Sequence, residues 1–496
     1  MREPSILEPN RLVRALGKPA RDFTKRDLVR FIADTDIRML NFRYVAGDGR
    51  LKKLNFVIHS PAHLDRILTA GERVDGSSLF PFVAADSSDL YVVPRYRTAF
   101  VNPFADVPTL DLLCSFYDAH GAPLESAPEH LVRKAQRALR DETGYELEAL
   151  GELEYYLFSP VDRIYPIVEQ RGYHESHPFS KWGLVRREAM MAIAEIGGLI
   201  KYGHAEVGNI LSGDLEMVQH EIEFLPVPIE EAADTLVIAK WALREVAYKH
   251  DLEVSFAPKI LVGQAGSGLH VHMRLTRDGA NVMTDDGGLT EPAKRLVAGL
   301  LSSAESLTAF GNTVPTSYLR LVPHQEAPTR VCWGDRNRSV LVRVPLGWRG
   351  VGERMIRDAN PREPTADVSP VDHNQTVELR SPDGSANVHL LLAGLAVAAR
   401  HGLTEPGALD LCDRSYVRAD ATKVEGLHEL PASCVDSASR LLAQRDRYEA
   451  QGVFPAGLID AIAAQLTGHG DRGLSERLYG DAAGLEALVR RHLHCG

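Results

Sequence analysis

The chain alternates between two hydrophobic periodicities, one typical of helices and one typical of strands. Apolar residues three or four positions apart predict amphipathic helices, for example over 24–35 and over 228–250. Period-two alternation or short apolar runs predict strands, among them 39–45, 145–158 and 268–275. Helix and strand patterns rarely alternate one for one, which argues against a doubly wound parallel sheet. The pattern therefore predicts an α+β fold.

The same pattern divides the chain into three parts. Residues 1–23 are rich in proline and arginine, and are expected to form a tail that either docks or stays loose. Residues 24–118 mix one or two helices with short strands and predict a small α+β domain. A turn-rich segment at 117–130 marks the boundary. Residues 119–496 then predict a larger α+β domain that becomes helical from about residue 384.

Composition narrows the class of protein. A net charge of −11 over 496 residues, without a basic stripe, argues against nucleic acid as a partner. The longest apolar run, 390–399, is too short to cross a membrane, and the N-terminal residues lack the apolar core of a signal peptide. The five cysteines form no CxxC pair and are widely spaced. They predict reduced thiols in a cytoplasmic protein.

Ionisable side chains two residues apart recur on several predicted strands, where such residues share one face. The pairs are Glu152 and Glu154, His204 and Glu206, His270 and His272, and Glu378 and Arg380. Any one pair alone could be a solvated strand face. Together they predict a single acidic cleft floored by a sheet, because buried charges need a partner or a bound ion. Carboxylates with imidazole, and without thiolates, suit Mg²⁺ or Mn²⁺.

A second unusual region is rich in arginine. Arg320, Arg336, Arg338 and Arg343 occur within 24 residues, with Glu326 between them on a proline-flanked loop. The forked donors of arginine suit carboxylates and phosphates. Taken alone, these arginines could equally be surface side chains in ion pairs. The sequence DGSS at 75–78 by itself indicates a tight turn.

Several segments occur in an order that resembles the signature segments of the glutamine synthetase family, from about residue 24 to the end. They are RVDGSSL, GELEYYLF, GHAEVG with QHEIEF, GSGLHVHMRL, SYLRLVPHQEAP, DRNRSVLVRVP and VELRSPDGSAN. The resemblance implies an N-terminal β-grasp domain and a catalytic domain with helices and an antiparallel sheet as its floor. It also implies ring-shaped homo-oligomers with active sites between subunits. The implied substrates are L-glutamate, ATP and ammonia or an amine, with two or three Mg²⁺ or Mn²⁺ ions per site.

The resemblance also implies roles for individual residues. The ligands of the metal on the glutamate side would be Glu154, Glu206 and Glu221, and those of the metal that bridges the ATP phosphates would be Glu152, His270 and Glu378. Glutamate and the transferred phosphoryl group would be held by Arg320, Arg338, Arg380 and the backbone at Gly266. ATP would contact His204, His272 and Arg343. Asp75 would bind ammonium and accept its proton, Glu326 would close over the intermediate, and Tyr173 would line the ammonium site.

The sequence departs from the family pattern at a few places. The spacing between Glu206 and Glu221 is several residues longer than usual, and so is the region 345–374. Thr376 stands where an arginine that contacts nucleotide is usual, and Ala265 replaces an asparagine before GSG. These changes lie at the nucleotide rim and near the acceptor pocket, and they leave the acceptor open.

Three functions are therefore weighed. The first is ligation of ammonia to the γ-carboxylate of glutamate through γ-glutamyl phosphate, which Asp75 favours. The second is the same chemistry with a larger amine, such as a polyamine, methylamine or ethanolamine. The third is a structural or regulatory paralogue without catalysis. The third is disfavoured because such a protein has no reason to keep the metal ligands and arginines together.

Overall fold

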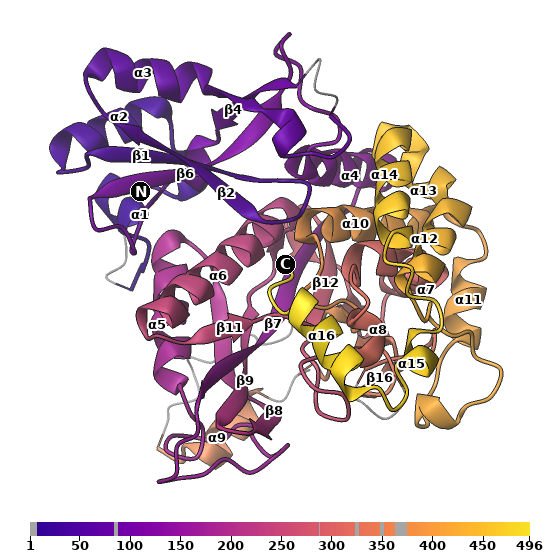
Figure 1. Cartoon of the computed structure of the whole chain (residues 1–496). Helices are drawn as coiled ribbons and strands as arrows, with labels where there is room; N and C mark the ends of the chain where they lie inside the picture. Colours follow the sequence, from indigo (N-terminus) through magenta and orange to yellow (C-terminus); the bar gives the residue numbers. More distant parts are fainter. Residues whose placement is uncertain (1–6, 84–87, 287, 323–326, 348–351, 363–373) are drawn as a thin grey trace.

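The structure is a computed structural model, and it confirms the α+β class. The described residues are 7–83, 88–286, 288–322, 327–347, 352–362 and 374–496. Two mixed sheets dominate: one in the N-terminal part, at the upper left of Figure 1, and a larger one that runs down through the centre of the molecule. Helices of the C-terminal part cover the right side in that view.

The N-terminal sheet has the order β2-β1-β6-β4-β3, with β5 paired to β6. Strands β1 and β6 are parallel, and the remaining pairs are antiparallel. The strands are β1 (Met39–Val45), β2 (Leu51–Val57), β3 (Glu72–Asp75), β4 (Asp89–Pro94), β5 (Phe100–Val101) and β6 (Thr109–Tyr117). The helices of this part are α1 (Arg11–Leu16), α2 (Lys25–Asp34) and α3 (Pro61–Ala70).

The larger sheet has the order β16-β17-β18-β12-β7-β9-β8, and only the β16–β17 pair is parallel. Its strands are β7 (Glu146–Pro160), β8 (Ile200–Ser212), β9 (Leu215–Phe224), β12 (Leu269–Arg277), β16 (Trp333–Asp335), β17 (Val342–Val344) and β18 (Val377–Leu379). Short strands extend it: β10 (Val227–Pro228) and β11 (Glu253–Ser255) on β7, and β13 (Ala280–Asn281) on β12. A separate ribbon joins β14 (Thr284–Asp285) and β15 (Gly288–Leu289).

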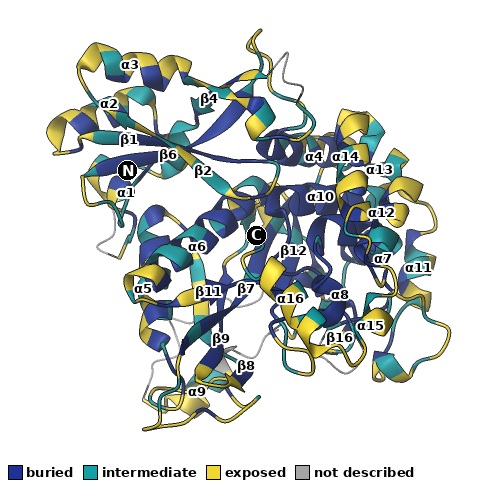
Figure 2. Ribbon diagram, viewed as in Figure 1, coloured by how far each residue is buried: buried dark blue, intermediate teal, exposed yellow. Residues whose placement is uncertain are grey.

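Helices pack around this sheet. Those in the middle of the chain are α4 (Pro128–Thr143), α5 (Gly183–Ile196), α6 (Ile229–Lys249), α7 (Glu291–Gly311), α8 (Ser317–Arg320) and α9 (Gly352–Ala359). The C-terminal ones are α10 (Val388–Thr404), α11 (Ala408–Arg414), α12 (Cys434–Ala443), α13 (Arg445–Glu449), α14 (Ala456–Thr467), α15 (Leu474–Arg477) and α16 (Ala482–His492). Figure 2 shows α10 buried along its length, while α3 and α16 expose one side. From α10 onward, the described elements are helices.

Local sequence explains several helix boundaries. Thr24 and Asp27 form a capping box at the start of α2, because each side chain accepts a hydrogen bond from the backbone N–H of the other. Ser60 and Asn387 cap α3 and α10 with side-chain oxygens. Gly144 ends α4 in the left-handed conformation, which glycine adopts without steric cost. The predicted N-terminal tail docks at Asn10, whose amide donates to the Ile196 carbonyl of α5.

The N-terminal and catalytic parts meet through a buried ion network. Arg95, at the end of β4, donates from both terminal nitrogens to Asp234 on α6, at 2.7 and 2.9 Å. It also donates to Glu230, which in turn accepts from Arg133 on α4. His389 on α10 approaches Asp234 to 3.2 Å. The network therefore connects β4 with three helices of the larger part.

The surface and the cysteines add three observations. All five cysteines are free thiols, and four of them are buried. Within the described part of the chain, no helix is long and apolar enough to cross a membrane.

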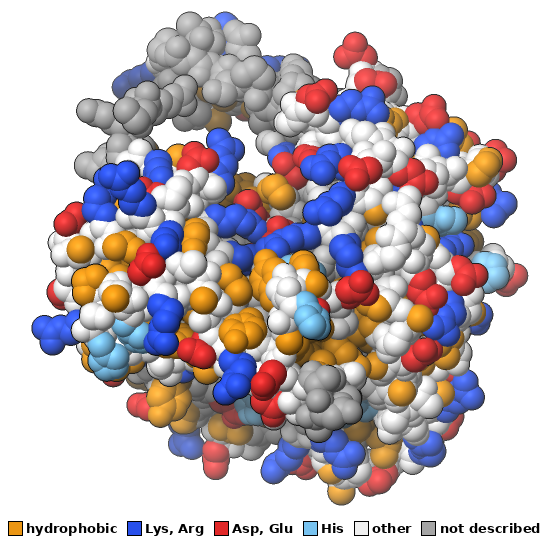
Figure 3. Space-filling view, turned by 90° about the horizontal axis from the view of Figure 1, so that it is seen from above, with side chains coloured by type: hydrophobic (Ala, Val, Ile, Leu, Met, Phe, Trp, Pro, Cys, Tyr) orange, Lys and Arg blue, Asp and Glu red, His pale blue; other side chains and the backbone are white. Residues whose placement is uncertain are grey.

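On the face seen from above, acidic and basic side chains are interspersed (Figure 3). The division at residues 118 and 119 stays a prediction.

Candidate functional site

The centre of the larger sheet carries two carboxylates on one strand. Glu152 and Glu154 lie two residues apart on β7, so their side chains share a face. In the register of the sheet, Glu152 lies opposite His270 on β12 and opposite Glu223 on β9. Glu154 lies opposite Glu221 on β9. Directly opposed residues are neighbours on one face, so these strands assemble one group of ionisable side chains.

Two more strands contribute to this group. Glu378 on β18 lies opposite His272 on β12, and Glu206 comes from an irregular stretch of β8. We term the whole set the acidic cluster; it consists of Glu152, Glu154, Glu206, Glu221, Glu223, Glu378, His270 and His272. Every metal ligand implied by the resemblance belongs to it. The predicted acidic cleft thus corresponds to one side of the sheet.

The histidines hold Glu152 between them. His270 Nδ1 lies 2.8 Å from Glu152 Oε2, and His272 Nε2 lies 2.9 Å from Glu152 Oε1. His272 Nδ1 is 3.0 Å from the Thr376 hydroxyl, so Thr376 orients this ring. Burial alone would raise the pKa of Glu152, but the two histidines outweigh it and hold the pKa well below its usual range.

Arginine side chains contact Glu378 and lie close to it. The carboxylate accepts from Arg343 at 2.9 Å and from Arg380, which directly follows β18. Burial opposes ionisation of Glu378, yet Arg380 and His272 lower its pKa below the ordinary value. Arg320 is also buried, and its terminal nitrogens lie 2.9 Å from the Ser381 carbonyl and 3.2 Å from His270 Nε2. The structure therefore brings three of the predicted arginines to the cluster.

The side of the cluster formed by β8 and β9 has excess negative charge. Burial, and then the charges of Glu154 and Glu221, raises the pKa of Glu206 to about 8. Burial, and then Glu152, Glu154 and Glu223, raises the pKa of Glu221 well above its usual value. Carboxylates crowded in this way need a cation to ionise together. Oxygen-rich sites with an imidazole fit Mg²⁺ or Mn²⁺, so the donor set fits the predicted ions.

Among the described residues, two sets of three side chains could each hold a metal ion, because the ligand atoms within each set all lie within 4.8 Å of one another. One set is Glu152, His272 and Glu378, and the other is Glu152, Glu221 and Glu223. The sets implied by the resemblance differ, since they place His270 rather than His272 with Glu378, and Glu206 rather than Glu223 with Glu221. The register gives the reason: Glu378 lies opposite His272, and Glu223 lies opposite Glu152. His270 Nδ1 still lies 3.7 Å from Glu378.

Glu223 was missed by the sequence analysis. It is buried, one of its oxygens accepts from Lys201 at 2.6 Å, and it stands two residues after Glu221 on the same strand. The signal was available, because QHEIEF carries the same two-residue spacing of carboxylates as GELEYYLF. On this strand, the resemblance to the family implies a role for Glu221 alone.

His204 on the edge strand β8, with His174 and Tyr173 beside it, extends the site. His204 Nε2 lies 3.2 Å from Glu221 Oε1. Its ring lies 4.3 Å from that of His174, which in turn stacks on Tyr173, also at 4.3 Å. Tyr173 is half exposed, so it forms the outer wall of the cluster on this side. The register of β8 against β9 shifts between Ala205 and Asn209, which places Glu206 in a bulge.

The backbone around Gly266 approaches the cluster closely. A Cβ atom at Gly266 would lie 2.4 Å from the Pro258 carbonyl and 3.0 Å from the Arg320 side chain, so only glycine fits there. Two residues later, the Gly268 amide donates to Glu154 Oε2 at 2.8 Å. The predicted glutamate-side loop is therefore in direct contact with the acidic cluster.

Two of the predicted residues that the structure describes are not brought to the cluster. Asp75 is exposed at the end of β3 and accepts from Ser77 and Ser78 of its own turn. Its strand pairs with β4, which lies at the top of Figure 1, whereas β8 and β9 lie at the bottom. Arg338 is exposed between β16 and β17, and it forms no ion pair with any other described residue. Glu326 lies outside the described residues.

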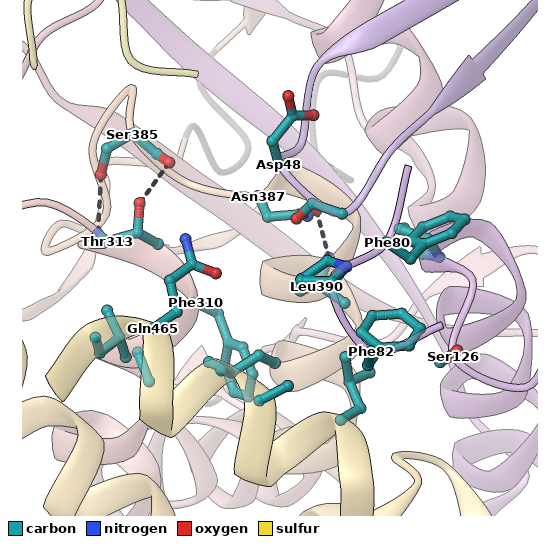
Figure 4. Close-up of a pocket in the computed structure, with 18 residues that line it drawn as sticks. Asp48, Phe80, Phe82, Ser126, Phe310, Thr313, Ser385, Asn387, Leu390 and Gln465 are labelled. Atoms are coloured by element: carbon teal, nitrogen blue, oxygen red, sulfur yellow. Dashed lines mark hydrogen bonds between the residues drawn. The ribbon is translucent and has the colours of Figure 1, made fainter. Parts of the chain in front are cut away.

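A separate pocket lies away from these residues. Phe80, Phe82 and Phe310 line it together with Leu390 and side chains of α14. Figure 4 shows Ser385 hydrogen-bonded to Thr313 on one side, with the rings of Phe80 and Phe82 on the other. Members of the acidic cluster do not line it. Asp48 is the charged residue among its lining side chains, which include none of the arginine, lysine or histidine groups that recognise phosphates.

Comparison with known proteins gives the family. The family model described as "Glutamine synthetase, catalytic domain" matches residues 125–464, and the one described as "Glutamine synthetase, beta-Grasp domain" matches 36–119. This chain belongs to the glutamine synthetase family. A glutamine synthetase of Clostridium saccharobutylicum is 30% identical over 428 residues, which are 84% of this chain and 89% of the relative. One of Staphylococcus aureus is 29% identical over 430 residues, 84% of this chain and 88% of the relative.

Solved structures agree on the fold. A cryo-EM structure of Plasmodium falciparum glutamine synthetase superposes with a TM-score of 0.74 at 18% identity, covering 92% of this chain and 99% of that one. A GmaS–ADP complex gives a TM-score of 0.69 at 19% identity, covering 90% and 96%. The resemblance to this family, the β-grasp domain and the catalytic domain are thereby confirmed. Membership supports ATP-dependent ligase activity.

Proposed function

We propose that this protein ligates ammonia to the γ-carboxylate of L-glutamate, using ATP and giving L-glutamine, ADP and phosphate through γ-glutamyl phosphate. The acidic cluster is the observation that supports the proposal. It joins carboxylates suited to divalent cations with buried arginines suited to anions, on one face of a sheet. A site that holds both is suited to phosphoryl transfer from ATP to a carboxylate.

The proposed cofactors are two or three Mg²⁺ or Mn²⁺ ions. Glu154, Glu206 and Glu221 would hold one, with Glu223 close by, and Glu152, Glu378 and the histidines would hold another. When bound, such ions neutralise charge on the ATP phosphates and on the phosphoryl group in transfer.

The protein's own groups would then orient the substrates. Arg320 and Arg380 are buried beside the cluster, where their charges would hold the glutamate carboxylates and the phosphoryl group. Arg343 and His204 would contact the ATP phosphates, and His272 would lie on the nucleotide side. Glu326 would help to exclude water from the acyl phosphate, which water would hydrolyse.

The position of Asp75 supports a role for a second subunit. Asp75 is exposed and its sheet lies at the other end of the molecule from β8 and β9, so within one subunit it does not complete the site. Large apolar side chains are exposed near α5 and β8, among them Leu184, Met191 and Leu199. Such side chains are typical of surfaces that associate. We therefore propose a ring-shaped homo-oligomer, located in the cytoplasm, in which Asp75 of one subunit faces the cluster of its neighbour.

The direct experiment measures phosphate release from ATP and Mg²⁺ with glutamate. Ammonium is compared with methylamine, ethanolamine and a polyamine as acceptors. Turnover with millimolar ammonium supports the proposal. Turnover with a larger amine alone would keep the activation of glutamate but change the acceptor. Protein that binds ATP but releases no phosphate with any acceptor would instead be a non-catalytic paralogue.

A variant at Asp75 tests the acceptor site. Asp75→Ala is expected to raise the KM for ammonium by about tenfold or more, because the carboxylate attracts ammonium and accepts its proton. The KM for ATP should stay within about twofold of the parent value. Asp89→Ala is the matched control, since Asp89 is an exposed carboxylate directly opposite Asp75 on β4. Equal ammonium kinetics in the two variants would remove Asp75 from the site.

A further inference from the structure

Gln219 makes contacts to three separate segments of the site. It is buried on β9, two residues before Glu221. Its amide nitrogen donates to Glu154 Oε2 at 2.9 Å and to the Gly266 carbonyl at 3.0 Å. Its amide oxygen accepts from the Gly208 backbone at 3.0 Å. One uncharged side chain therefore joins β7, the loop before β12 and the bulge of β8.

Only an amide can satisfy this arrangement. Gln219 offers two N–H donors and one acceptor oxygen at the end of a single side chain. An ionised glutamate at this position would have no donor for Glu154 or for the Gly266 carbonyl, and would add a like charge beside Glu154. An apolar residue would leave the Gly208 amide and the Gly266 carbonyl without this partner.

Other side chains hold the same loop. The Gln170 amide oxygen accepts from the Ala265 backbone at 2.8 Å, and the Tyr156 hydroxyl donates to the Ala265 carbonyl at 2.8 Å. Lys259 donates to the Gln264 carbonyl at 2.7 Å. These contacts hold the backbone of the loop. Gln219 links the loop to Glu154 of the acidic cluster through a side chain, beside the direct backbone contact from the Gly268 amide.

The packing around Gln219 leaves little room for adjustment. A Cβ atom at Gly208 would lie 2.5 Å from the Gln219 amide oxygen and 2.0 Å from the Tyr156 hydroxyl. Gly208 follows Glu206 by two residues in the bulge. A shift of Gln219 would therefore move the Glu206 backbone and the Gly266 carbonyl as well as the partner of Glu154.

We propose that Gln219 is a positioning residue that couples the carboxylate side of the site, through Glu154, to the glutamate side, through Gly266. Cation binding and glutamate binding would then each favour the same loop geometry and support one another. The glutamate half of this inference rests on the proposed function. The coupling of the loop to Glu154 does not, because it concerns contacts within the protein.

The test uses Gln219→Met, which keeps the length of the side chain and removes its hydrogen bonds. The matched control is Gln444→Met. Gln444 also bridges two segments, since it donates to the Ser302 carbonyl and accepts from Ser306, far along the chain from the acidic cluster. Hydrogen exchange of peptides covering 258–268 and 206–209 is measured in both variants. Mn²⁺ binding is measured by calorimetry without substrates, and then KM and kcat are determined.

Gln219→Met is expected to speed exchange in both segments and to weaken Mn²⁺ binding by about tenfold. In the same variant the KM for glutamate should rise by about tenfold, while the KM for ATP and kcat stay within about twofold. Gln444→Met should change none of these. Unchanged exchange and Mn²⁺ binding, or an equal effect in the control, would overturn the proposal.

The design separates a failure of the proposed function from a failure of the Gln219 proposal. If the parent protein shows no glutamate-dependent turnover, the proposed function fails, yet exchange and Mn²⁺ binding still decide the coupling. If Gln219→Met does not fold, Gln219→Asn takes its place. The shorter amide keeps the chemistry but cannot reach Glu154, Gly266 and Gly208 together, so it should give the same selective rise in the KM for glutamate.

Discussion

At the scale of single residues, Glu378 shows how the site balances its charges. Its carboxylate is fully buried and contacts Arg343 and Arg380 directly, with both histidines of β12 within 4 Å. A buried carboxylate is unfavourable unless it is paired, and a buried arginine needs the same compensation. Glu378 therefore has two roles: it neutralises the arginines and it belongs to a group of atoms suited to a cation.

Replacing this carboxylate tests both roles, one by Mn²⁺ binding and the other by thermal stability. Glu378→Gln is expected to weaken Mn²⁺ binding by about tenfold or more, and to lower the melting temperature because Arg343 and the buried Arg380 lose their negatively charged partner. Glu216→Gln is the control, since Glu216 is equally buried on β9 but accepts from Ser159 and from the Asp162 backbone instead. Calorimetry with Mn²⁺ measures the first effect, and thermal unfolding the second. Equal Mn²⁺ affinity in the two variants would remove Glu378 from the metal site.

At the scale of elements, the helices α7 and α10 support the sheet through unusually close contact. A Cβ atom at Gly402 would lie 2.1 Å from the Arg295 carbonyl and 2.6 Å from the Gly299 nitrogen. A Cβ atom at Gly299 would lie 2.1 Å from the Ala398 carbonyl. Small residues let two helix backbones approach in this way. The pair of glycines therefore sets the distance between two buried helices.

The close contact predicts that a methyl group added at Gly402 destabilises the protein more than one added at Gly407. Gly402→Ala should lower the free energy of unfolding by about 1–3 kcal/mol, because the backbones must move apart. Gly407→Ala should have a far smaller effect, since nothing lies within 4 Å of the added atom. Urea unfolding of both variants measures the difference. A Gly402→Ala variant as stable as the control would contradict the close packing of α7 and α10.

At the scale of the whole molecule, the ion network around Arg95 joins the two parts of the chain. Arg95 directly follows β4, and its partners Glu230 and Asp234 come from the first turns of α6. Burial would lower the pKa of this arginine, but Asp234 and Glu230 outweigh it and keep the guanidinium charged. The bidentate geometry adds directional contacts that a single charge would not provide. The network thus fixes the β-grasp sheet relative to the catalytic part.

Breaking this network should lower the free energy of unfolding far more than breaking an exposed ion pair does. Arg95→Ala is expected to destabilise the protein by about 3–5 kcal/mol, because it leaves Asp234 buried without its main partner. Arg73→Ala removes an exposed pair with Asp89 and should cost at most about 1 kcal/mol. Chemical unfolding of the two variants provides the comparison. Similar losses in both would show that the network contributes no more than a surface contact.

How far the sequence predicts the site depends on the type of residue. Glu152, Glu154, His270, His272 and Glu378 were identifiable, because side chains two apart on a strand share a face whatever surrounds them. Glu223 carries the same signal but was not assigned. Gln219 gives no comparable signal, since a neutral amide follows no charge pattern and its partners come from distant segments. The pairing of ligands into groups was also not predictable, because strand register decides it.

By itself the sequence determined the α+β class, most of the elements and the chemistry of the cluster, since these depend on periodicity and on residue type. The order of its motifs carried the resemblance to the family. Tertiary structure alone decided which strands are neighbours, which carboxylates face which histidines, and where Asp75 lies relative to them. It also decided the excess of negative charge around Glu206 and Glu221. Charges interact through space, and the sequence specifies distance along the chain but not distance across a sheet.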